Sequence, residues 1–261
     1  MKKYALIGRN IGYSFSALVH QEIATGAEIE LEYTIMSIEP EGFVAAINRL
    51  KSGFDGFNIT KPYKSDILPY LYKNNSVTGA VNTVDIKNNE LIGYNTDGTG
   101  FLKSLVYHNI KVDGDVLILG AGGAARTIAY ELDKIADVFI YNRTTEKAKS
   151  IIDDLKLKNT YVADFDKLSP KLVINATTLG YNHEMSLPDY VKTDKLETVY
   201  DTIYNPKVTP IIDWANKREI RAVNGLAMLF FQALDAQKIW NGINLSQSQI
   251  LEILKNLEAR I

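Results

Sequence analysis

The sequence predicts an α/β fold of two domains, and three observations lead to this prediction. Short runs of β-forming residues alternate with helix-like segments through the first third of the chain. A second alternating series, in the middle of the chain, carries a glycine-rich turn between a strand and a helix. Beyond residue 225, two helix-like segments follow each other with no strand between them. Such alternation is typical of mainly parallel sheets covered by helices, and 261 residues suffice for two modest domains.

The first third is expected to contain three helices and several short strands. Residues 40–50 have the clearest helical pattern, because their apolar residues recur every three or four positions behind Pro40. Residues 80–95 are typical of two short strands around a polar turn at 87–90. The other expected elements are strands at 4–8, 31–38 and 54–59 and helices at 16–25 and 64–72.

The middle of the chain is expected to be a βαβ series. It opens with an apolar strand at 115–119, which runs through the glycine-rich turn into a helix that ends near residue 132. This order of strand, glycine turn and helix is that of dinucleotide-binding domains. Further strands are expected at 138–141, 172–175, 198–201 and 220–223, and the two final helices at 226–240 and 246–257.

The composition argues against several classes of function. The formal net charge is −2, whereas a protein that binds nucleic acid usually carries a basic excess or stripe. Cysteine is absent, which excludes disulfides and thiol chemistry, and three scattered histidines do not suggest a metal site. No apolar stretch approaches a membrane span, and the apolar run near the N-terminus is too short for a signal peptide. We therefore expect a cytoplasmic protein.

The glycine-rich turn is the first candidate binding site. Backbone N–H groups at the start of a helix can hold a pyrophosphate, and a strand before the turn strengthens this interpretation over a plain tight turn. Ala125 stands where the third glycine of the dinucleotide fingerprint would be, and a small residue is accepted there. The turn consists of Gly120, Ala121, Gly122, Gly123 and Ala124.

The end of the next strand indicates which dinucleotide is bound. NAD sites usually place an acidic residue there for the ribose 2′-hydroxyl, but this chain has Asn142, Arg143 and Thr144, followed by Lys147. A guanidinium can bind a 2′-phosphate through two parallel hydrogen bonds, and the lysine adds positive charge. The pattern favours NADP, although an exposed arginine after a strand is common.

One segment could supply the proton that a carbonyl reduction needs, and a second could orient the donor. Lys64 ends a loop that follows a strand, where α/β folds place their ligands. Asp97 could orient that lysine. Spacing alone does not separate this role of Lys64 from that of an ordinary surface lysine. Ser14 and Ser16 could similarly hold a substrate carboxylate, but by themselves they are better explained as a turn and a helix cap.

Taken together and in this order, these segments resemble the shikimate dehydrogenases over essentially the whole chain. The matching segments are 8–20, 58–64, 79–83, 95–98, 120–124, 142–144, 175–177, 200–206 and 225–232. Tyr13, Lys61 and Ala227 depart from the usual family pattern. No single segment is specific, but the set is.

The resemblance implies a fold, a reaction and a site. It implies an N-terminal α/β substrate domain (residues 1–99 with 231–261, to which the C-terminal helices return) and a Rossmann-type doubly wound NADP domain (residues 100–230). The implied reaction is the reversible reduction of 3-dehydroshikimate to shikimate, with Lys64 as acid/base and Asp97 as its partner. The implied substrate-binding residues are Ser14, Ser16, Asn58, Thr60, Asn82, Tyr204 and Gln232. Thr202 and Gly225 join the glycine turn and the segment 142–147 in binding the cofactor.

Two alternatives stay open at this point. One is a quinate/shikimate dehydrogenase that uses NAD, and the other is a regulator that binds shikimate without turning it over. Retention of both Lys64 and Asp97 speaks against the regulator. The expected partners are small molecules, without nucleic acid, metal or membrane, and the expected state is a monomer or a homodimer.

Overall fold

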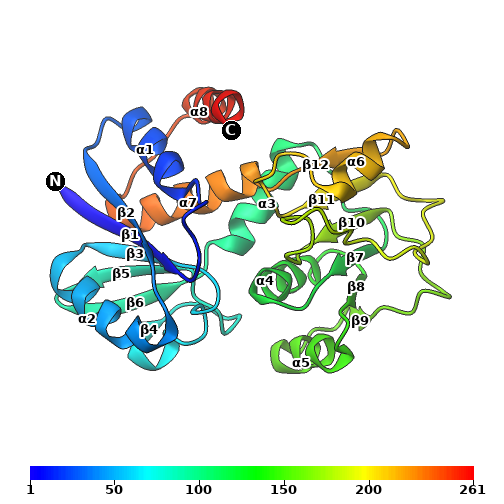
Figure 1. The fold of residues 1–261 in the computed structure, drawn as a ribbon, viewed down its shortest axis with the longest axis horizontal. Helices are drawn as coiled ribbons and strands as arrows, with labels where there is room; N and C mark the ends of the chain where they lie inside the picture. Colours follow the sequence, from blue (N-terminus) through cyan, green and yellow to red (C-terminus); the bar gives the residue numbers. More distant parts are fainter. The chain divides into compact units, whose positions relative to one another are not determined.

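A computed structural model describes the whole chain, residues 1–261, and divides it into two compact units. The first unit comprises Met1–Gly100 and Leu229–Ile261, and the second comprises Phe101–Met228. Each unit is built on one six-stranded sheet with helices on its faces (Figure 1). The predicted α/β class is therefore confirmed.

The sheet of the first unit is mixed rather than mainly parallel. Its strands, in sheet order, are β2 (Leu31–Ser37), β1 (Lys2–Gly8), β3 (Gly56–Ile59), β5 (Thr83–Lys87), β6 (Glu90–Tyr94) and β4 (Lys73–Asn74). The strands β1, β2 and β3 run parallel, whereas β5 is antiparallel to both β3 and β6. The short turn at 87–90 accounts for the pairing of β5 with β6, because so short a connection can join only antiparallel strands.

Helices cover both faces of this sheet. Residues alternate along β1, so that Tyr4 packs with Trp240 on one side while Ala5 and Ile7 pack with Leu50 on the other. The first side is covered by α1 (Ser16–Gly26), α7 (Leu226–Asn241) and α8 (Gln247–Arg260), and the second by α2 (Phe43–Gly53) (Figure 1). Because β1 and β3 run parallel, the segments that follow them leave the sheet at the same edge.

The second unit has a fully parallel sheet with helices on both faces. Its strands, in sheet order, are β12 (Arg221–Val223), β11 (Thr198–Asp201), β10 (Leu172–Asn175), β7 (Val116–Leu119), β8 (Val138–Tyr141) and β9 (Thr160–Val162). The helices are α4 (Gly123–Leu132), α5 (Thr145–Leu155), α6 (Pro210–Asn216) and most of α3 (Asp97–Tyr107), whose first four residues belong to the first unit. This strand order is that of the doubly wound dinucleotide-binding domains, which bind ligands at the carboxyl ends of the strands.

One predicted helix is wrong. Residues 64–72 contain only two short 3₁₀ or turn segments, of which Leu68–Tyr70 is the regular one. Pro69 lacks the backbone N–H that an α-helix needs in its interior, and its ring opposes continuation of a helix. None of the helices combines the length and the apolar character that a membrane crossing requires.

Candidate active site

The segment that follows β3 carries Lys64 and is anchored at two points. The backbone N–H of Thr60 donates to the carbonyl of Ile7 (2.9 Å), which keeps the segment joined to β1. Tyr63 is buried and donates its hydroxyl to the carbonyl of Ile38 (2.6 Å). Burial raises the pKa of Tyr63, so the phenol remains a donor. The residue next to Lys64 is thereby fixed to the body of the unit.

Lys64 forms an ion pair with Asp97, as the sequence led us to expect. The distance from Lys64 Nζ to Asp97 Oδ2 is 2.5 Å, and the two side chains are only 18% and 10% exposed. Asp97 is the first residue of α3, where the helix dipole favours a carboxylate. An ammonium held in direction by a carboxylate can deliver a proton to an oxygen at the surface of the unit.

Asn82 links Asp97 to its surroundings. Its side-chain nitrogen donates to Asp97 Oδ1 (2.8 Å) and lies 3.3 Å from Gln232 Oε1, while its side-chain oxygen accepts the backbone N–H of Thr96 (2.8 Å). The amide of Gln232 is oriented in turn, because its nitrogen donates to the carbonyl of Leu229 (2.8 Å). Side chains from the ends of several elements thus meet in one hydrogen-bonded group.

Asn58 lies beneath this group, in β3. It is 4% exposed, and its side-chain nitrogen donates to the carbonyl of Asn82 (3.1 Å) and to the hydroxyl of Thr83 (3.0 Å). Its oxygen accepts the hydroxyl of Tyr33 (2.7 Å). Both amide hydrogens are therefore in use, and only the oxygen could accept a hydrogen bond from a bound molecule.

Ser14 and Ser16 form a pair at the start of α1. The hydroxyl of Ser14 donates to Ser16 Oγ (3.0 Å), and the backbone N–H of Ser16 points back at Ser14 Oγ (3.2 Å). The helix begins at Ser16, so this residue is not its cap. The loop that carries the pair lies beside the Lys64 segment, because the N–H of Arg9 donates to the carbonyl of Lys61 (3.1 Å).

The glycine-rich turn of the second unit leaves a helix start uncapped. Gly120 has a φ of +106° and donates its N–H to the carbonyl of Tyr141 (2.7 Å); a side chain there would lie 3.0 Å from the carbonyl oxygen of Ala176. The cap residue of α4 is Gly122, and no side chain accepts its first N–H groups. Ala125 is buried against the sheet core, as the fingerprint requires. The turn therefore suits an anionic phosphate group.

The segment after β8 presents two exposed cations. Arg143 and Lys147 both lie on the surface, and Asn142 donates its side-chain nitrogen to the carbonyl of Thr144 (2.9 Å). Thr144 occupies the N-cap position of α5, but its side chain makes no capping hydrogen bond. The nearest acidic residue in the sequence is Glu146, in the first turn of α5. The strand tip thus carries net positive charge.

Three more predicted residues lie in the second unit. Thr202 follows β11 and donates its N–H to the carbonyl of Asn175 (2.9 Å). Gly225 packs directly on Thr202, so closely that a Cβ atom would lie 2.1 Å from the Thr202 carbonyl oxygen. Only glycine fits there without movement of the backbone. Tyr204 is partly buried in the loop that follows Thr202.

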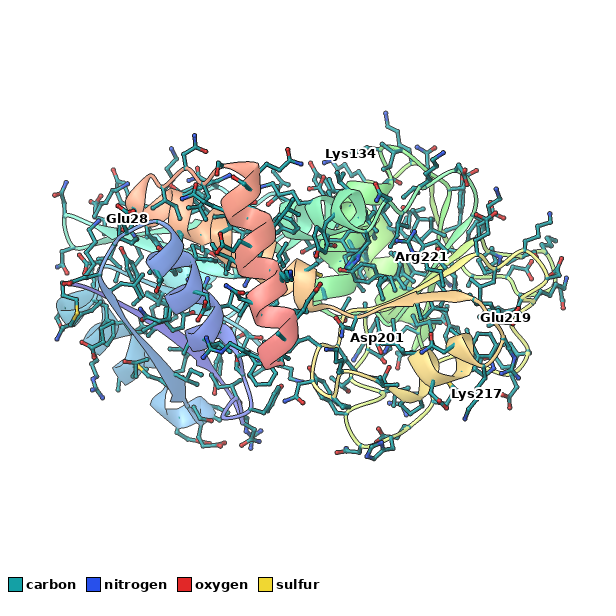
Figure 2. The ribbon with its side chains drawn as sticks, turned by 90° about the horizontal axis from the view of Figure 1, so that it is seen from above. Glu28, Lys134, Asp201, Lys217, Glu219 and Arg221 are labelled. Atoms are coloured by element: carbon teal, nitrogen blue, oxygen red, sulfur yellow. The ribbon has the colours of Figure 1, made fainter.

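Sequence reasoning missed the buried carboxylate beside Thr202. Asp201 lies at the end of β11 (Figure 2) and is fully buried. It accepts hydrogen bonds from Thr209 Oγ1 (2.5 Å), Asn175 Nδ2 (2.9 Å) and the N–H of Ile203 (3.0 Å). Burial raises its pKa to about 6, although these three donors act in the opposite direction. An acid at the end of an otherwise apolar strand was the available signal.

The structure gathers no group of three or more acidic or histidine side chains that could hold a metal ion. The predicted site residues fall into two sets, one in each unit. The first unit joins Lys64, Asp97, Asn82, Gln232 and Asn58 in one network and places the serine pair and Thr60 at the same sheet edge. The second unit holds the glycine turn, the cationic segment, Thr202, Tyr204 and Gly225.

Two family models match the chain. One is described as the shikimate dehydrogenase substrate binding domain and matches residues 6–84. The other is described as shikimate / quinate 5-dehydrogenase and matches residues 105–236. Together they extend over both units.

Proteins of known name and structure are similar along the full length. A shikimate dehydrogenase (NADP(+)) of Caldicellulosiruptor saccharolyticus is 39% identical, over 100% of both chains. One of Methanocaldococcus jannaschii is 35% identical, over 98% of this chain and 95% of its own. The solved shikimate 5-dehydrogenase of Thermus thermophilus, in complex with NADP(H) and shikimate, is 28% identical with a TM-score of 0.88, and the match covers 98% of this chain and 99% of that one.

Proposed function

This chain belongs to the shikimate dehydrogenase family, and we propose that it catalyses the reversible NADPH-dependent reduction of 3-dehydroshikimate to shikimate. This is a step of the shikimate pathway, which leads to the aromatic amino acids. The observation that carries the proposal is the ion pair of 2.5 Å between Lys64 and Asp97, held by Asn82 and Gln232. A protein that only bound the ligand would have no need of so constrained a proton donor.

Lys64 is the proton donor in this proposal. NADPH, when bound, supplies the hydride that adds to the carbonyl carbon. As negative charge develops on the carbonyl oxygen, the proton on Lys64 Nζ passes to that oxygen, and in the reverse direction Lys64 takes the proton from the hydroxyl. Asp97 fixes the direction of the Nζ–H bonds and stabilises the ammonium. Asn82 prevents Asp97 from turning away.

The substrate is held by polar side chains in addition to this pair. We assign the shikimate carboxylate to the hydroxyls of Ser14 and Ser16, which already lie 3.0 Å apart. We assign the ring hydroxyls and the carbonyl of the substrate to side chains that can donate or accept hydrogen bonds. These are Thr60, Asn82, Tyr204 and Gln232, with Asn58 contributing through its oxygen.

The residues of the second unit fit NADP. The uncapped start of α4 suits the pyrophosphate, and the cations after β8 suit the 2′-phosphate. Gly225 approaches the Thr202 backbone more closely than any residue with a Cβ atom could, and we assign this pair to the cofactor as well. The proposed set is Gly120, Ala121, Gly122, Gly123, Ala124, Asn142, Arg143, Thr144, Lys147, Thr202 and Gly225.

The proposal extends to organisation and location. We assign residues 1–99 with 231–261 to substrate binding and catalysis, and residues 100–230 to NADP binding. The division of the chain into two compact units supports this assignment. We further propose that the protein works in the cytoplasm, on small molecules alone, as a monomer or a homodimer.

The test is an absorbance assay at the NADPH band, with shikimate and quinate each offered together with NADP or NAD. We expect the fastest turnover with shikimate and NADP. The second candidate is a quinate dehydrogenase, which the description of the matched C-terminal model favours. Faster turnover with quinate and NAD would support it instead. A protein that binds shikimate but reduces no cofactor under any of the four conditions would be a regulator.

A further inference from the structure

Asp201 joins the ends of two neighbouring strands in the second unit (Figure 2). Its Oδ1 atom accepts hydrogen bonds from the backbone N–H of Ile203 (3.0 Å) and from Asn175 Nδ2 (2.9 Å). Its Oδ2 atom accepts the hydroxyl of Thr209 (2.5 Å). Both carboxylate oxygens are in use, and the residue has no exposed surface. Asp201 therefore holds three groups at one point of the carboxyl edge of the sheet.

The Ile203 N–H fixes the direction of the peptide bond that follows Thr202. This peptide bond is trans, so its N–H and its carbonyl point in opposite directions, and the Thr202 carbonyl points away from Asp201. Gly225 meets that carbonyl, because a Cβ atom on Gly225 would lie 2.1 Å from the Thr202 oxygen. The Gly225 N–H also donates to the Ile203 carbonyl (3.0 Å). The contact between Thr202 and Gly225 thus depends on the peptide direction that Asp201 sets.

Asn175 brings the loop after β10 to the same carboxylate. Its side-chain nitrogen donates to Asp201 and also to the carbonyl of Leu179 (3.0 Å). Its side-chain oxygen accepts the N–H (3.1 Å) and the hydroxyl (2.7 Å) of Thr177. The backbone carbonyl of Asn175 accepts the N–H of Thr202 (2.9 Å). Thr202 is therefore held at its own N–H by Asn175 and at the next N–H by Asp201.

The strand order places Thr202 and Gly225 in a different half of the sheet from the glycine turn. A doubly wound sheet with this order has two mononucleotide-binding halves, here β7 to β9 and β10 to β12. The glycine turn and Arg143 follow β7 and β8, and the 2′-phosphate assigned to Arg143 belongs to the adenosine half of NADP. Thr202 and Gly225 follow β11 and β12, so under the proposed function they belong to the half that receives the nicotinamide.

We propose that Asp201 is a positioning residue for the nicotinamide half of the cofactor site, acting through Asn175 and the peptide bond that follows Thr202. The inference rests on the proposed function, because that function assigns Thr202 and Gly225 to the cofactor. Asp201 itself touches neither substrate nor cofactor, since both of its oxygens bind protein groups. None of its hydrogen bonds reaches Arg143 or the start of α4.

Asp201→Ala removes both oxygens and tests this role through binding. Two ligands separate the halves, because NADP occupies both, whereas adenosine 2′,5′-bisphosphate has only the adenosine half with its 2′-phosphate. We expect the Kd for NADP to rise about tenfold and that for the bisphosphate to stay within about twofold, as isothermal titration measures. The kcat with shikimate should fall roughly 10- to 100-fold, because hydride transfer depends on the placement of the nicotinamide ring.

Asp201→Asn is the conservative variant. Its side-chain oxygen can accept the same two N–H groups, and its nitrogen can donate to the Thr209 hydroxyl, which also accepts. The Kd for NADP and the kcat should therefore return to within about threefold of the wild type. Tyr200→Phe is the matched control, because Tyr200 is the preceding residue of β11, is fully buried and shares a hydrogen bond with Ser104 (2.7 Å). Its loss should lower the Tm without a change in the Kd for NADP.

Three results would overturn the inference. They are an unchanged Kd for NADP or an equal rise of both Kd values in Asp201→Ala, a loss in Asp201→Asn as large as in Asp201→Ala, and an equal rise of the Kd for NADP in Tyr200→Phe. Thr209→Val replaces Asp201→Ala if that variant does not fold, because it removes only the hydroxyl that holds Oδ2. It should raise the Kd for NADP about threefold and leave that for the bisphosphate in place. An unchanged Kd for NADP in Thr209→Val would then count against the inference.

Amide hydrogen exchange tests the positioning without any ligand. In Asp201→Ala, the N–H groups of Ile203 and Gly225 should exchange about tenfold faster or more, whereas that of Val199, inside β11, should keep its wild-type rate. Equal acceleration at Val199, or none at Ile203, contradicts the inference even if the wild type proves inactive on shikimate. Inactivity of a wild type that binds NADP normally would contradict the proposed reaction alone.

Discussion

The two units hold their candidate functional groups in opposite ways. In the first unit, Lys64, Asp97 and Asn82 are tied together by side-chain hydrogen bonds and are largely removed from water. In the second unit, phosphate binding relies on a backbone turn, and the cations Arg143 and Lys147 stand exposed on the surface. A group that transfers a proton must be oriented toward the reacting atom. A phosphate, in contrast, can accept hydrogen bonds from donors in several directions.

This difference predicts how substitutions will behave. In the first unit, one change should disturb several groups, so the effects of single substitutions should not add. In the second unit, exposed side chains act nearly alone, and their effects should be local. Asp201 is the exception in the second unit, because it is buried and accepts three hydrogen bonds.

The largest effect is expected for Lys64→Ala. General acid–base groups contribute roughly 10²–10⁴-fold to rate, so kcat should fall by about that factor while the Kd for NADP stays nearly unchanged. Steady-state kinetics with shikimate and fluorescence titration with NADP measure the two quantities. Asp97→Asn should approach the same loss, because the two residues act as a unit and their effects are not additive.

Lys61→Ala is the control for that prediction. Lys61 belongs to the same loop and has the same charge, but its side chain is exposed. It should change the KM for shikimate at most modestly. If Lys61→Ala abolished turnover while Lys64→Ala kept it, the proton donor would have been misassigned.

The next effect concerns the stability of the second unit. The raised pKa of Asp201, about 6 against an ordinary 3.8, means that the unfolded chain releases this proton first as the pH rises. Stability from this group is fully present below about pH 4 and is lost as the pH rises through about 6, by an amount on the order of 3 kcal/mol. Asparagine does not titrate, so Asp201→Asn does not lose this stability as the pH rises. Its free energy of unfolding, relative to that of the wild type, should therefore increase between about pH 4.5 and about pH 7.

Urea unfolding of both proteins at the two pH values measures this gain. Asp194→Asn is the control, because Asp194 is an exposed carboxylate whose pKa is lowered by the Ser169 hydroxyl. The free energy of unfolding of Asp194→Asn, relative to that of the wild type, should not increase as the pH rises. Parallel unfolding curves of wild type and Asp201→Asn at both pH values would show that Asp201 does not titrate in this range.

Arg143→Ala tests the cofactor assignment. Loss of a charge-assisted contact to the 2′-phosphate should cost about 1.5–3 kcal/mol, which corresponds to about 10- to 150-fold in the KM for NADP. The KM for NAD should hardly change, since NAD has no 2′-phosphate. Equal changes for both cofactors would refute the role of Arg143. Lys147→Ala should also raise the KM for NADP more than the KM for NAD, but by a smaller factor than Arg143→Ala.

The fold could be predicted where one principle dominated the sequence. The apolar run Val116–Leu119 and the glycines after it determined the start of the second sheet, because little else satisfies that pattern. The helix expected at 64–72 did not form, because Pro69 lacks a backbone N–H and opposes continuation of an α-helix. The mixed first sheet was missed because strand direction depends on pairing between distant segments, which periodicity does not report.

The site could be predicted only in part for a similar reason. Lys64 and Asp97 are 33 residues apart, so the residues alone could offer Asp97 only as a candidate partner, and the family resemblance implied the pair. Asp201 was not proposed at all, because its significance lies in burial and in partners such as Thr209 and Asn175. Such contacts form only in the folded chain.

The smallest effect is expected for the two serines. If Ser14 and Ser16 bind the carboxylate of shikimate equally in the ground state and the transition state, Ser16→Ala should cost about 1 kcal/mol, or about fivefold in KM, with little change in kcat. Ser14→Ala should cost more, because Ser14 Oγ also holds the hydroxyl and the N–H of Ser16. The double variant should then lose less than the sum, as the comparison of the units requires. Normal shikimate binding by both single variants would mean that this segment is only a turn before α1. Additive losses in the double variant would mean that the two serines act independently, unlike the hydrogen-bonded network of the first unit.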